Sequence, residues 1–465
     1  MVIAGLLLLE ASYGVCSQDD AYISFRYAQN LARGLGFVYN PGEVVEGYTN
    51  FLWTVLFVPT ELAGIDPGPV STAYGYILSA VLLVTAWRLG GRDWRPATLV
   101  ACFPGLALEA VQGLETVLYA VLVALALEGR RGWWAFAGLA ALTRPEGYAV
   151  FGILWLFRRE KLPLGGFLAM TVPHVAFRLA YYGDLVPNTF HAKVGGGEGV
   201  MGGALIRGLR YIGEGASASL PIFVAAALGA GLLLIAAQAR RRAGLPEGEQ
   251  DGPWRPALVL IGFFLFYILL VGGDFKGTGR FLIPLLVPMA VLSRALFSRL
   301  PPVGRLTVVA LALVWAAPGW QSMANFAVRF STDLADRREA GLRLRELVPE
   351  DRWLAVHAAG ILPYYAELPT IDMWGLNDAH IAKAPVEGLG SGIAGHERAD
   401  YAYVLRRRPA LILTEADLIT PVPAALPDPG VFGPEFLQIY TPVSLPMGER
   451  YINGWALRPD ENNAM

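Results

Sequence analysis

Charged residues are scarce in this chain of 465 residues. Asp, Glu, Lys and Arg together make up 16% of it, whereas an average soluble domain carries about 25%. Hydrophobic residues account for 54% of the chain, and the mean hydropathy is +0.44. This composition excludes an ordinary soluble domain and indicates a membrane protein that crosses the bilayer several times.

The sequence also lacks the pattern of a disulfide framework, a long basic run and a cleavable signal peptide. The chain has two cysteines, Cys16 and Cys102, in or beside apolar segments, so no disulfide framework is expected. The net charge is −2 and no long basic run occurs, which gives no indication of a nucleic-acid partner. Residues 2–16 are apolar but lack a basic start and a small-residue cleavage site. They are therefore predicted to be a retained first membrane helix.

About 20 apolar residues span a bilayer, and the sequence predicts about eleven transmembrane helices. The predicted spans are 2–16, 70–87, 97–113, 114–128, 132–144, 146–157, 164–181, 218–238, 256–272, 281–298 and 306–320. Segment 51–64 is also apolar, but it is short, contains Pro59 and ends near Glu61. We therefore expect it to be an interfacial or re-entrant helix.

Arginine placement predicts the orientation. With a cytoplasmic N-terminus, one set of loops collects most of the arginines, as cytoplasmic loops do: Arg88, Arg92, Arg95, Arg130, Arg131, Arg158, Arg159, Arg240, Arg241, Arg242, Arg299 and Arg305. The opposite set collects the other polar clusters: Asp19, Asp20, Glu109, Gln112, Glu115, Arg144, Glu146, residues 184–193, Asp274, Lys276 and Arg280. The sequence thus predicts a transmembrane domain over 1–324, with a first external loop at 17–69 and its polar clusters on one face.

The character of the chain changes near Asn325. Residues 333–347 have the pattern of an amphipathic helix. A strand is expected over 352–356, a helical piece over 361–368, and a helix–strand unit over 399–407 and 410–413. Alternating strands and helices predict a small α/β domain, which would cover 325–465 and lie outside the membrane.

The first external loop holds the adjacent acids Asp19 and Asp20, directly after an apolar segment. Acidic residues at a membrane bundle cost free energy and so suggest a function. From Tyr22 the spacing is helical, because Tyr22, Arg26 and Asn30 fall on one face. We expect an interfacial helix whose dipole favours the acidic pair at its N-terminus.

The run DDAYISFRYAQNLARGLGFVYNPGEVVEGYTNFLW at 19–53 carries a resemblance. It is similar to the first external loop of the GT-C superfamily of polyprenyl-phosphate-sugar-dependent glycosyltransferases, in particular the group of mycobacterial terminal β-(1→2)-arabinofuranosyltransferases. Six further blocks extend it in the same order: GLET (113–116), LTRPEG (142–147), YYGDLVPNTFHAK (181–193), GGDFKGTGRF (272–281), IDMWGLNDAHIA (371–382) and GHERAD (395–400).

The resemblance implies a GT-C membrane fold and transfer of a sugar, a pentose such as arabinofuranose being the best guess. Asp19 or Asp20 would act as general base on an acceptor hydroxyl. That hydroxyl would attack the anomeric carbon and expel a polyprenyl phosphate. Many members hold a divalent cation near this motif, so Mg²⁺, Mn²⁺ or Ca²⁺ at Asp19 and Asp20 is a further expectation.

The resemblance also implies two sets of binding residues. The donor phosphate and sugar would contact Tyr22, Arg26, Glu46, Tyr48, Asn50, Glu115, Arg144, Glu146, Asn188, His191, Lys193, Asp274 and Arg280. The acceptor, an envelope glycan, lipid or protein, would contact Trp374, Asn377, Asp378, His380, His396 and Glu397. The implied location is a bacterial inner membrane, with the C-terminal domain in the periplasm.

Several alternatives stay open at the level of the sequence. The acidic pair could simply cap its helix, and Arg26 could pair with it as structural support. A flippase or transporter of lipid-linked sugars is a second candidate, although it should show paired halves or charges along a central path. A non-catalytic membrane protein that binds cell-wall glycan is a third. The sequence does not distinguish an inverting from a retaining transferase.

Overall fold

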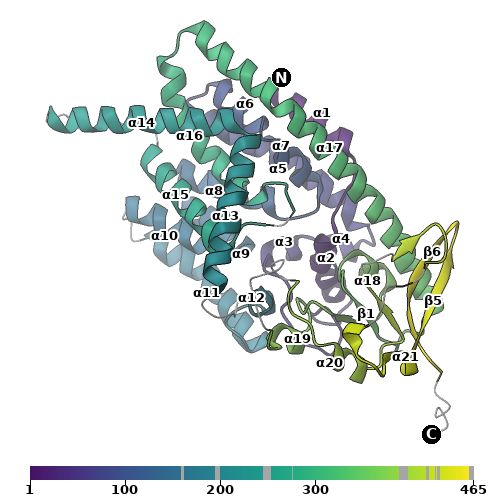
Figure 1. Ribbon diagram of the computed structural model, residues 1–465. Helices are drawn as coiled ribbons and strands as arrows, with labels where there is room; N and C mark the ends of the chain where they lie inside the picture. The colour runs from purple at the N-terminus through teal and green to yellow at the C-terminus, as the bar shows by residue number, and fades with distance from the viewer. Residues whose placement is uncertain are drawn as a thin grey trace.

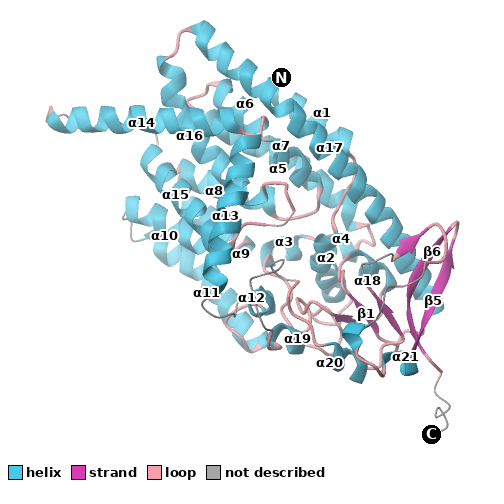
Figure 2. Ribbon diagram, viewed as in Figure 1, coloured by secondary structure: helices cyan, strands magenta, loops and turns pink. Residues whose placement is uncertain are grey.

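The computed structural model describes residues 1–158, 162–193, 199–243, 253–274, 276–386, 396–414, 418–424, 426 and 430–459. A bundle of helices forms most of the molecule, and the strands are confined to one end of it (Figures 1 and 2). The N-terminus lies at the other end of the bundle (Figure 1).

The helices follow one another closely along the chain. The first group is α1 (Val2–Tyr13), α2 (Asp19–Ala32), α3 (Phe51–Leu56), α4 (Val58–Leu62), α5 (Pro67–Leu89), α6 (Trp94–Ala101), α7 (Pro104–Val111), α8 (Thr116–Glu128), α9 (Trp133–Thr143), α10 (Gly147–Arg158) and α11 (Leu162–Tyr182). The second group is α12 (Asn188–Lys193), α13 (Gly199–Ala218), α14 (Leu220–Arg242), α15 (Trp254–Val271), the 3-10 helix η2 (Arg280–Leu285), α16 (Leu286–Arg299) and α17 (Pro302–Leu347).

The predicted spans coincide with helices, but not all are long enough to cross a membrane alone. Among the described residues, 6 helices are long and apolar enough, or up to 7 if the pair α7 and α8, bent by 115°, counts as one. The expectation of a single span over 97–113 is wrong, because the chain breaks between Ala101 and Pro104 and proline favours a helix start. Segment 51–64 forms two short helices, α3 and α4.

Helix α17 is the longest element. Its 46 residues correspond to about 69 Å at the usual helical rise. The sequence predicted two separate helices, at 306–320 and 333–347, but one helix runs through both and through residue 325. Figure 1 shows α17 reaching from the far end of the bundle to the strands, so it links the membrane helices to the C-terminal region.

The C-terminal region contains a six-stranded sheet. Its elements are β1 (Leu354–Val356), α18 (Ile361–Ala366), β2 (Thr370–Asp372), α19 (Ala379–Lys383), α20 (Tyr401–Arg406), β3 (Leu411–Leu413), β4 (Ile419–Thr420), the 3-10 helix η3 (Gly430–Phe432), α21 (Phe436–Ile439), β5 (Tyr440–Met447) and β6 (Arg450–Leu457). The strand order is β2-β1-β3-β6-β4, with β5 also paired to β6. β1, β2 and β3 are parallel, and every pairing with β6 is antiparallel.

The predicted strands at 352–356 and 410–413 are present as β1 and β3, and the predicted helical pieces are present as α18 and α20. The first external loop packs directly on this region. Ile23 and Tyr27 of α2 share one hydrophobic core with Leu354 and Val356 of β1 and with Leu362 of α18. Burial of this shared core fixes α2 against the sheet.

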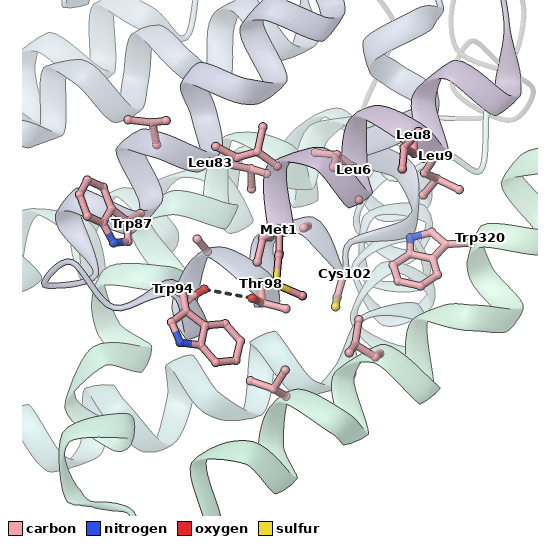
Figure 3. A pocket seen from close by; sticks show the side chains of 18 residues that line it. Met1, Leu6, Leu8, Leu9, Leu83, Trp87, Trp94, Thr98, Cys102 and Trp320 are labelled. Carbon is pink, nitrogen blue, oxygen red and sulfur yellow. Dashed lines mark hydrogen bonds between the residues drawn. The ribbon is translucent and has the colours of Figure 1, made fainter. Parts of the chain in front are cut away.

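A large cavity lies elsewhere, between α1, α5, α6 and α17. Its volume is about 1130 Å³, and none of the 18 side chains that line it is charged (Figure 3). Its one hydroxyl group, on Thr98, donates to the carbonyl of Trp94 at 3.0 Å. A cavity lined in this way offers no acid, base or phosphate ligand, so the candidate site is sought at Asp19 and Asp20.

Candidate active site

The acidic pair stands at the first turn of α2, and its two side chains have different partners. Asp19 accepts hydrogen bonds from the backbone N–H groups of Gly360 at 2.9 Å and Ile361 at 2.8 Å. Arg337 of α17 lies 4.0 Å from the same carboxylate. Asp19 therefore ties α2 to the start of α18. Position 360 must be glycine, since an added Cβ would lie 1.8 Å from the carbonyl oxygen of Asp19.

Asp20 faces the membrane bundle instead. Its carboxylate pairs with the ammonium of Lys276 at 2.5 Å, and the Asp20 side chain is 44% exposed. The Lys276 ammonium also donates to the side-chain oxygen of Gln18. Gln18 is itself held by the side chain of Gln112 at 2.5 Å. Of the two acids, Asp20 is the one with an accessible carboxylate.

Lys276 lies in the glycine-rich loop between α15 and η2, and Arg280 is the first residue of η2. Arg280 pairs with Asp274 of the same loop at 2.5 Å. Burial alone would raise the pKa of Asp20, but the positive charges of Lys276, Arg280 and Lys193 hold it below its usual value. Asp20 thus lies in a cationic environment built from this loop and the end of α12, and it is ionised at neutral pH.

A second ionic network lies next to this one. Arg144 donates to Glu115 at 2.7 Å and to Glu146 at 2.9 Å. Glu115 also accepts from Asn50 at 3.0 Å. The guanidinium groups of Arg144 and Arg280 lie 5.3 and 5.2 Å from the ring of Phe281. The structure therefore brings four of the predicted donor residues, Asn50, Glu115, Arg144 and Glu146, into one buried network close to Arg280.

Arg26 is placed in a way that argues against the predicted contact with the donor phosphate. Its side chain is 3% exposed, and its guanidinium donates to the carbonyls of Tyr39, Pro363 and Leu368 at 2.9, 2.9 and 2.7 Å. It also lies over the ring of Tyr39, 4.2 Å from the centroid. The contacts described include no ion pair between Arg26 and Asp19 or Asp20, which was the alternative prediction for Arg26. Arg26 instead joins α2 to α18.

Other predicted donor residues are structural too. Tyr22 is buried in an aromatic cluster, and its hydroxyl lies 3.2 Å from that of Tyr365. Glu46 forms a two-pronged ion pair with Arg178, at 2.7 and 3.0 Å. Tyr48 packs against Phe37 with its hydroxyl 3.2 Å from Tyr182. Tyr22 thus packs against α18, whereas Glu46 and Tyr48 pair with side chains of α11. None of the three reaches Asp20 in the contacts described.

Helix α12 carries three more predicted residues. The Asn188 side chain donates to the carbonyls of Gly375 and Leu376 at 2.9 and 3.0 Å, which docks α12 on the loop after β2. His191 lies 2.9 Å from Asp184. Lys193, at the end of the helix, is exposed and acts electrostatically on Asp20. Of these three, Lys193 is the one whose charge acts on Asp20, and its contact with the donor stays a prediction.

The predicted acceptor residues divide in the same way. Trp374 lies between two histidines, with its ring centroid 5.0 Å from that of His357 and 4.0 Å from that of His396. His357 follows β1 and is three residues from Gly360, whose N–H group donates to Asp19. The Cα atoms of His357 and Gly360 are therefore at most about 11 Å apart. Because the carboxyl ends of β1 and β2 meet at one edge of the sheet, this aromatic group lies near the acidic pair.

Asn377, Asp378 and His380 are held by neighbours within the C-terminal region. Asn377 donates to Asp372 at 3.0 Å. Asp378 caps α19 by accepting from the N–H groups of His380 and Ile381. The imidazole of His380 contacts Asp400 at 2.8 Å. Glu397 is half-buried beside His396 in the sequence. Asn377, Asp378 and His380 thus have partners within the C-terminal region, and an acceptor role for the six predicted residues stays a prediction.

The two aspartates do not fit a divalent-cation site. The Asp19 oxygens accept from backbone N–H groups, and the Asp20 carboxylate is paired with an ammonium, so the two carboxylates do not converge on a shared point. Hard cations need several converging oxygen ligands. Among the residues the structure describes, no group of three or more His, Cys, Asp or Glu side chains could hold a metal. The expectation of a metal at Asp19 and Asp20 is therefore not supported.

Three residues of the site received no role from the sequence. Lys276 was visible as part of a polar cluster, but its partner Asp20 is 256 residues away. Gln18 directly precedes the acidic pair and was given no role of its own. His357 directly follows the strand predicted at 352–356, and its position at the edge of parallel strands was the one signal that could have drawn attention to it.

Comparison with known proteins bears on this geometry. Residues 325–456 match a family described as a domain of unknown function (DUF8728). The chain is 29% identical to the terminal beta-(1->2)-arabinofuranosyltransferase of Mycobacterium tuberculosis, over 66% of this chain and 58% of that protein. It is 27% identical to the protein of the same name from Corynebacterium glutamicum, over 66% and 51%. The chain spans less than two thirds of the length of either relative.

The fold also matches a solved structure over nearly its whole length. The crystal structure of ArnT from Cupriavidus metallidurans bound to undecaprenyl phosphate superimposes with a TM-score of 0.62 and 14% identity, covering 98% of this chain and 97% of that chain. The apo state of ArnT gives the same values. The chain has the GT-C fold. The membrane fold and the resemblance predicted from the sequence are confirmed.

Proposed function

We propose that this protein is a membrane glycosyltransferase that takes a sugar from a polyprenyl-phosphate donor and transfers it to a hydroxyl group of an envelope glycan, lipid or protein. Arabinofuranose is the sugar favoured by the names of the relatives. The observation that carries the proposal is Asp20, a half-exposed carboxylate at the mouth of a GT-C bundle with Lys276, Arg280 and Lys193 around it. Undecaprenyl phosphate on ArnT supports a donor of the same chemistry.

Asp20 is the general base in this proposal. Its carboxylate takes the proton of the acceptor hydroxyl as the acceptor oxygen bonds to the anomeric carbon. The bond from that carbon to the phosphate oxygen breaks, and polyprenyl phosphate leaves with the bonding electrons. A positioned base contributes about 10²–10⁴-fold, and nearby cations stabilise the charge that develops on the leaving phosphate. Asp19 positions the helix and is not the base, because both of its oxygens accept backbone N–H groups.

The acceptor would approach from the C-terminal region. Trp374, with His357 and His396 beside it, presents aromatic surface near the acidic pair. Rings of this kind suit the C–H faces of sugars, while Glu397 suits their hydroxyl groups. In this arrangement the α/β region, proposed to cover 325–465, lies outside the membrane. The arginine-rich loops support a cytoplasmic N-terminus.

The test compares two neighbouring acids. Purified protein in lipid nanodiscs would be assayed for transfer from a polyprenyl-phospho-arabinofuranose to an arabinan acceptor. Asp20→Asn is expected to lower kcat by about 10²-fold or more, whereas Asp19→Asn should retain most of the turnover per folded molecule. Wild-type turnover by Asp20→Asn would refute the assignment of the base. Movement of the donor lipid across the bilayer without transfer would favour a flippase instead.

A further inference from the structure

The pairing of Asp20 with Lys276 poses a mechanistic problem that rests on the proposed function. A carboxylate in contact with an ammonium is stabilised as the anion and is a weak base. The cation that holds Asp20 ionised must therefore be drawn away before Asp20 can take a proton from the acceptor. The structure indicates which cation can move and what draws it.

We propose that Lys276 is a shared cation, which pairs with Asp20 while the donor is absent and with the phosphate of the donor lipid once it binds. The transfer of its ammonium couples the two substrates, because donor binding releases Asp20 to act on the acceptor. Lys276 thus acts as a donor-binding residue and as the positioning residue of the base, and the donor must bind before the acceptor reacts.

The exposure of the anionic partners distinguishes Lys276 from the other cations described here. The carboxylate of Asp20 is 44% exposed, whereas Asp274, which holds Arg280, is 4% exposed. Glu115 and Glu146, which hold Arg144, are 7% and 5% exposed. Leaving a fully buried carboxylate without its cation is strongly unfavourable, whereas the partly exposed carboxylate of Asp20 keeps contact with water. Exchange of partners therefore costs least at Lys276.

The surroundings of Lys276 keep it at the site during the exchange. Gln18 accepts from its ammonium, and Gln18 is anchored by Gln112 through side-chain and backbone hydrogen bonds. An ammonium has three donors, so one can stay on Gln18 while another changes from Asp20 to a phosphate oxygen. The loop contains Gly272, Gly273, Gly277 and Gly279, all with positive φ, and glycine permits such backbone conformations without strain.

The phosphate also finds further positive charge at this place. The charges of Lys193 and Arg280 both lower the pKa of Asp20, so an anion next to Lys276 would also be attracted by these two cations. Phosphate favours sites where several cationic donors meet. The Asp20 carboxylate is paired with an ammonium, which serves as the mobile counter-charge.

Binding of undecaprenyl phosphate to the purified full chain in nanodiscs tests the proposal without turnover. Lys276→Gln should weaken binding by about 10-fold or more, the loss of one charged hydrogen bond. Asp20→Asn should strengthen binding of undecaprenyl phosphate several-fold in the wild-type background, because the Asp20 carboxylate no longer competes with the phosphate for Lys276. In the Lys276→Gln background the gain should be much smaller, because there is no ammonium to compete for. Lys383→Gln, which removes an exposed lysine paired with Asp184, is the control and should bind like the wild type.

Two results would overturn the proposal. One is binding within 2-fold of the wild type by a folded Lys276→Gln protein. The other is an equal gain from Asp20→Asn in both backgrounds, which would mean direct repulsion of the phosphate by the carboxylate. If Lys276→Gln does not fold, Asp20→Asn alone decides, since unchanged affinity in that variant excludes competition for Lys276. Equal affinity for inorganic phosphate would reject the lipid phosphate as the ligand. Failure of the proposed function is seen separately, as normal transfer by Asp20→Asn.

Discussion

Asp19 and Gly360 are 341 residues apart in the chain and are joined by a hydrogen bond of 2.9 Å from the backbone N–H of Gly360 to the Asp19 carboxylate. The contact links the first external loop to the C-terminal region, and it leaves Asp20, the next residue, facing Lys276. The two adjacent acids thus have different roles. Asp19 joins the first external loop to the C-terminal region, and the carboxylate of Asp20 remains accessible.

Removal of the Asp19 carboxylate should therefore destabilise the protein. Asp19→Ala leaves the N–H groups of Gly360 and Ile361 without their partner, at a cost of about 1–3 kcal/mol. Thermal unfolding in detergent should show a lower midpoint, and amide exchange should rise at residues 360–366. Asp333→Ala, which breaks an i,i+4 pair with Arg337 on α17, is the control and should cost about 0.5 kcal/mol or less. Equal stability of the two variants would contradict the structural role of Asp19.

Arg26 should behave as a structural residue as well. Arg26→Lys cannot reach the carbonyls of Tyr39, Pro363 and Leu368 together, because an ammonium lacks the planar fork of the guanidinium. The expected result is a lower unfolding midpoint, with the KM for the donor within 2-fold in the protein that remains folded. Arg33→Lys, at a more exposed pair with Glu367, should have a smaller effect. A 10-fold rise in KM at unchanged stability would return Arg26 to the donor site.

These cases show where the sequence was sufficient. The spacing of Tyr22, Arg26 and Asn30 predicted the helix α2, and the apolar runs predicted the membrane helices, because both depend on local periodicity. The sequence could not show that Arg26 meets Leu368 or that Asp20 meets Lys276, since such contacts join residues hundreds of positions apart. The continuity of α17 was missed for a related reason. Its hydrophobic pattern changes from membrane-like to amphipathic, while its backbone hydrogen bonds continue.

The assignment of residues to the site was limited by the same gap. The resemblance identified Lys193, Arg144 and Arg280 by motif, and all three lie near Asp20 or Phe281. It could not separate them from Glu46 or Tyr48, whose motifs are equally distinct but whose side chains are buried against α11. A sequence motif indicates that a residue is important for the protein. The contacts of its side chain are needed to tell whether it binds substrate or stabilises the fold.

Helix α14 offers a test of the membrane packing. Gly229 faces α16 so closely that an added Cβ would lie 2.0 Å from the carbonyl oxygen of Leu292, whereas Gly231 has nothing within 4 Å. Gly229→Ala should lower stability by about 1–3 kcal/mol or more, because the two helices must separate. Gly231→Ala changes the same helix by the same methyl group and should stay within about 1 kcal/mol of the wild type. Thermal unfolding of both variants in one detergent decides, and equal midpoints would mean that α14 and α16 do not pack as described.

Asp372 gives the C-terminal region a specific pH dependence. Burial raises the pKa of Asp372 to about 6, although N–H groups of Asn377 and Trp374 donate to it. The folded protein thus binds a proton more readily than the unfolded chain, in which an aspartate titrates near about 4. The contribution of Asp372 to the free energy of unfolding is therefore greatest below about pH 4. As the pH rises to about 6 and above, about 3 kcal/mol of this contribution is lost.

Asp372→Asn lacks this titration, so its stability relative to the wild type should improve between pH 4 and pH 7. The exposed Asp351→Asn control should follow the wild type, and parallel curves for all three proteins would show that Asp372 is not buried as an acid.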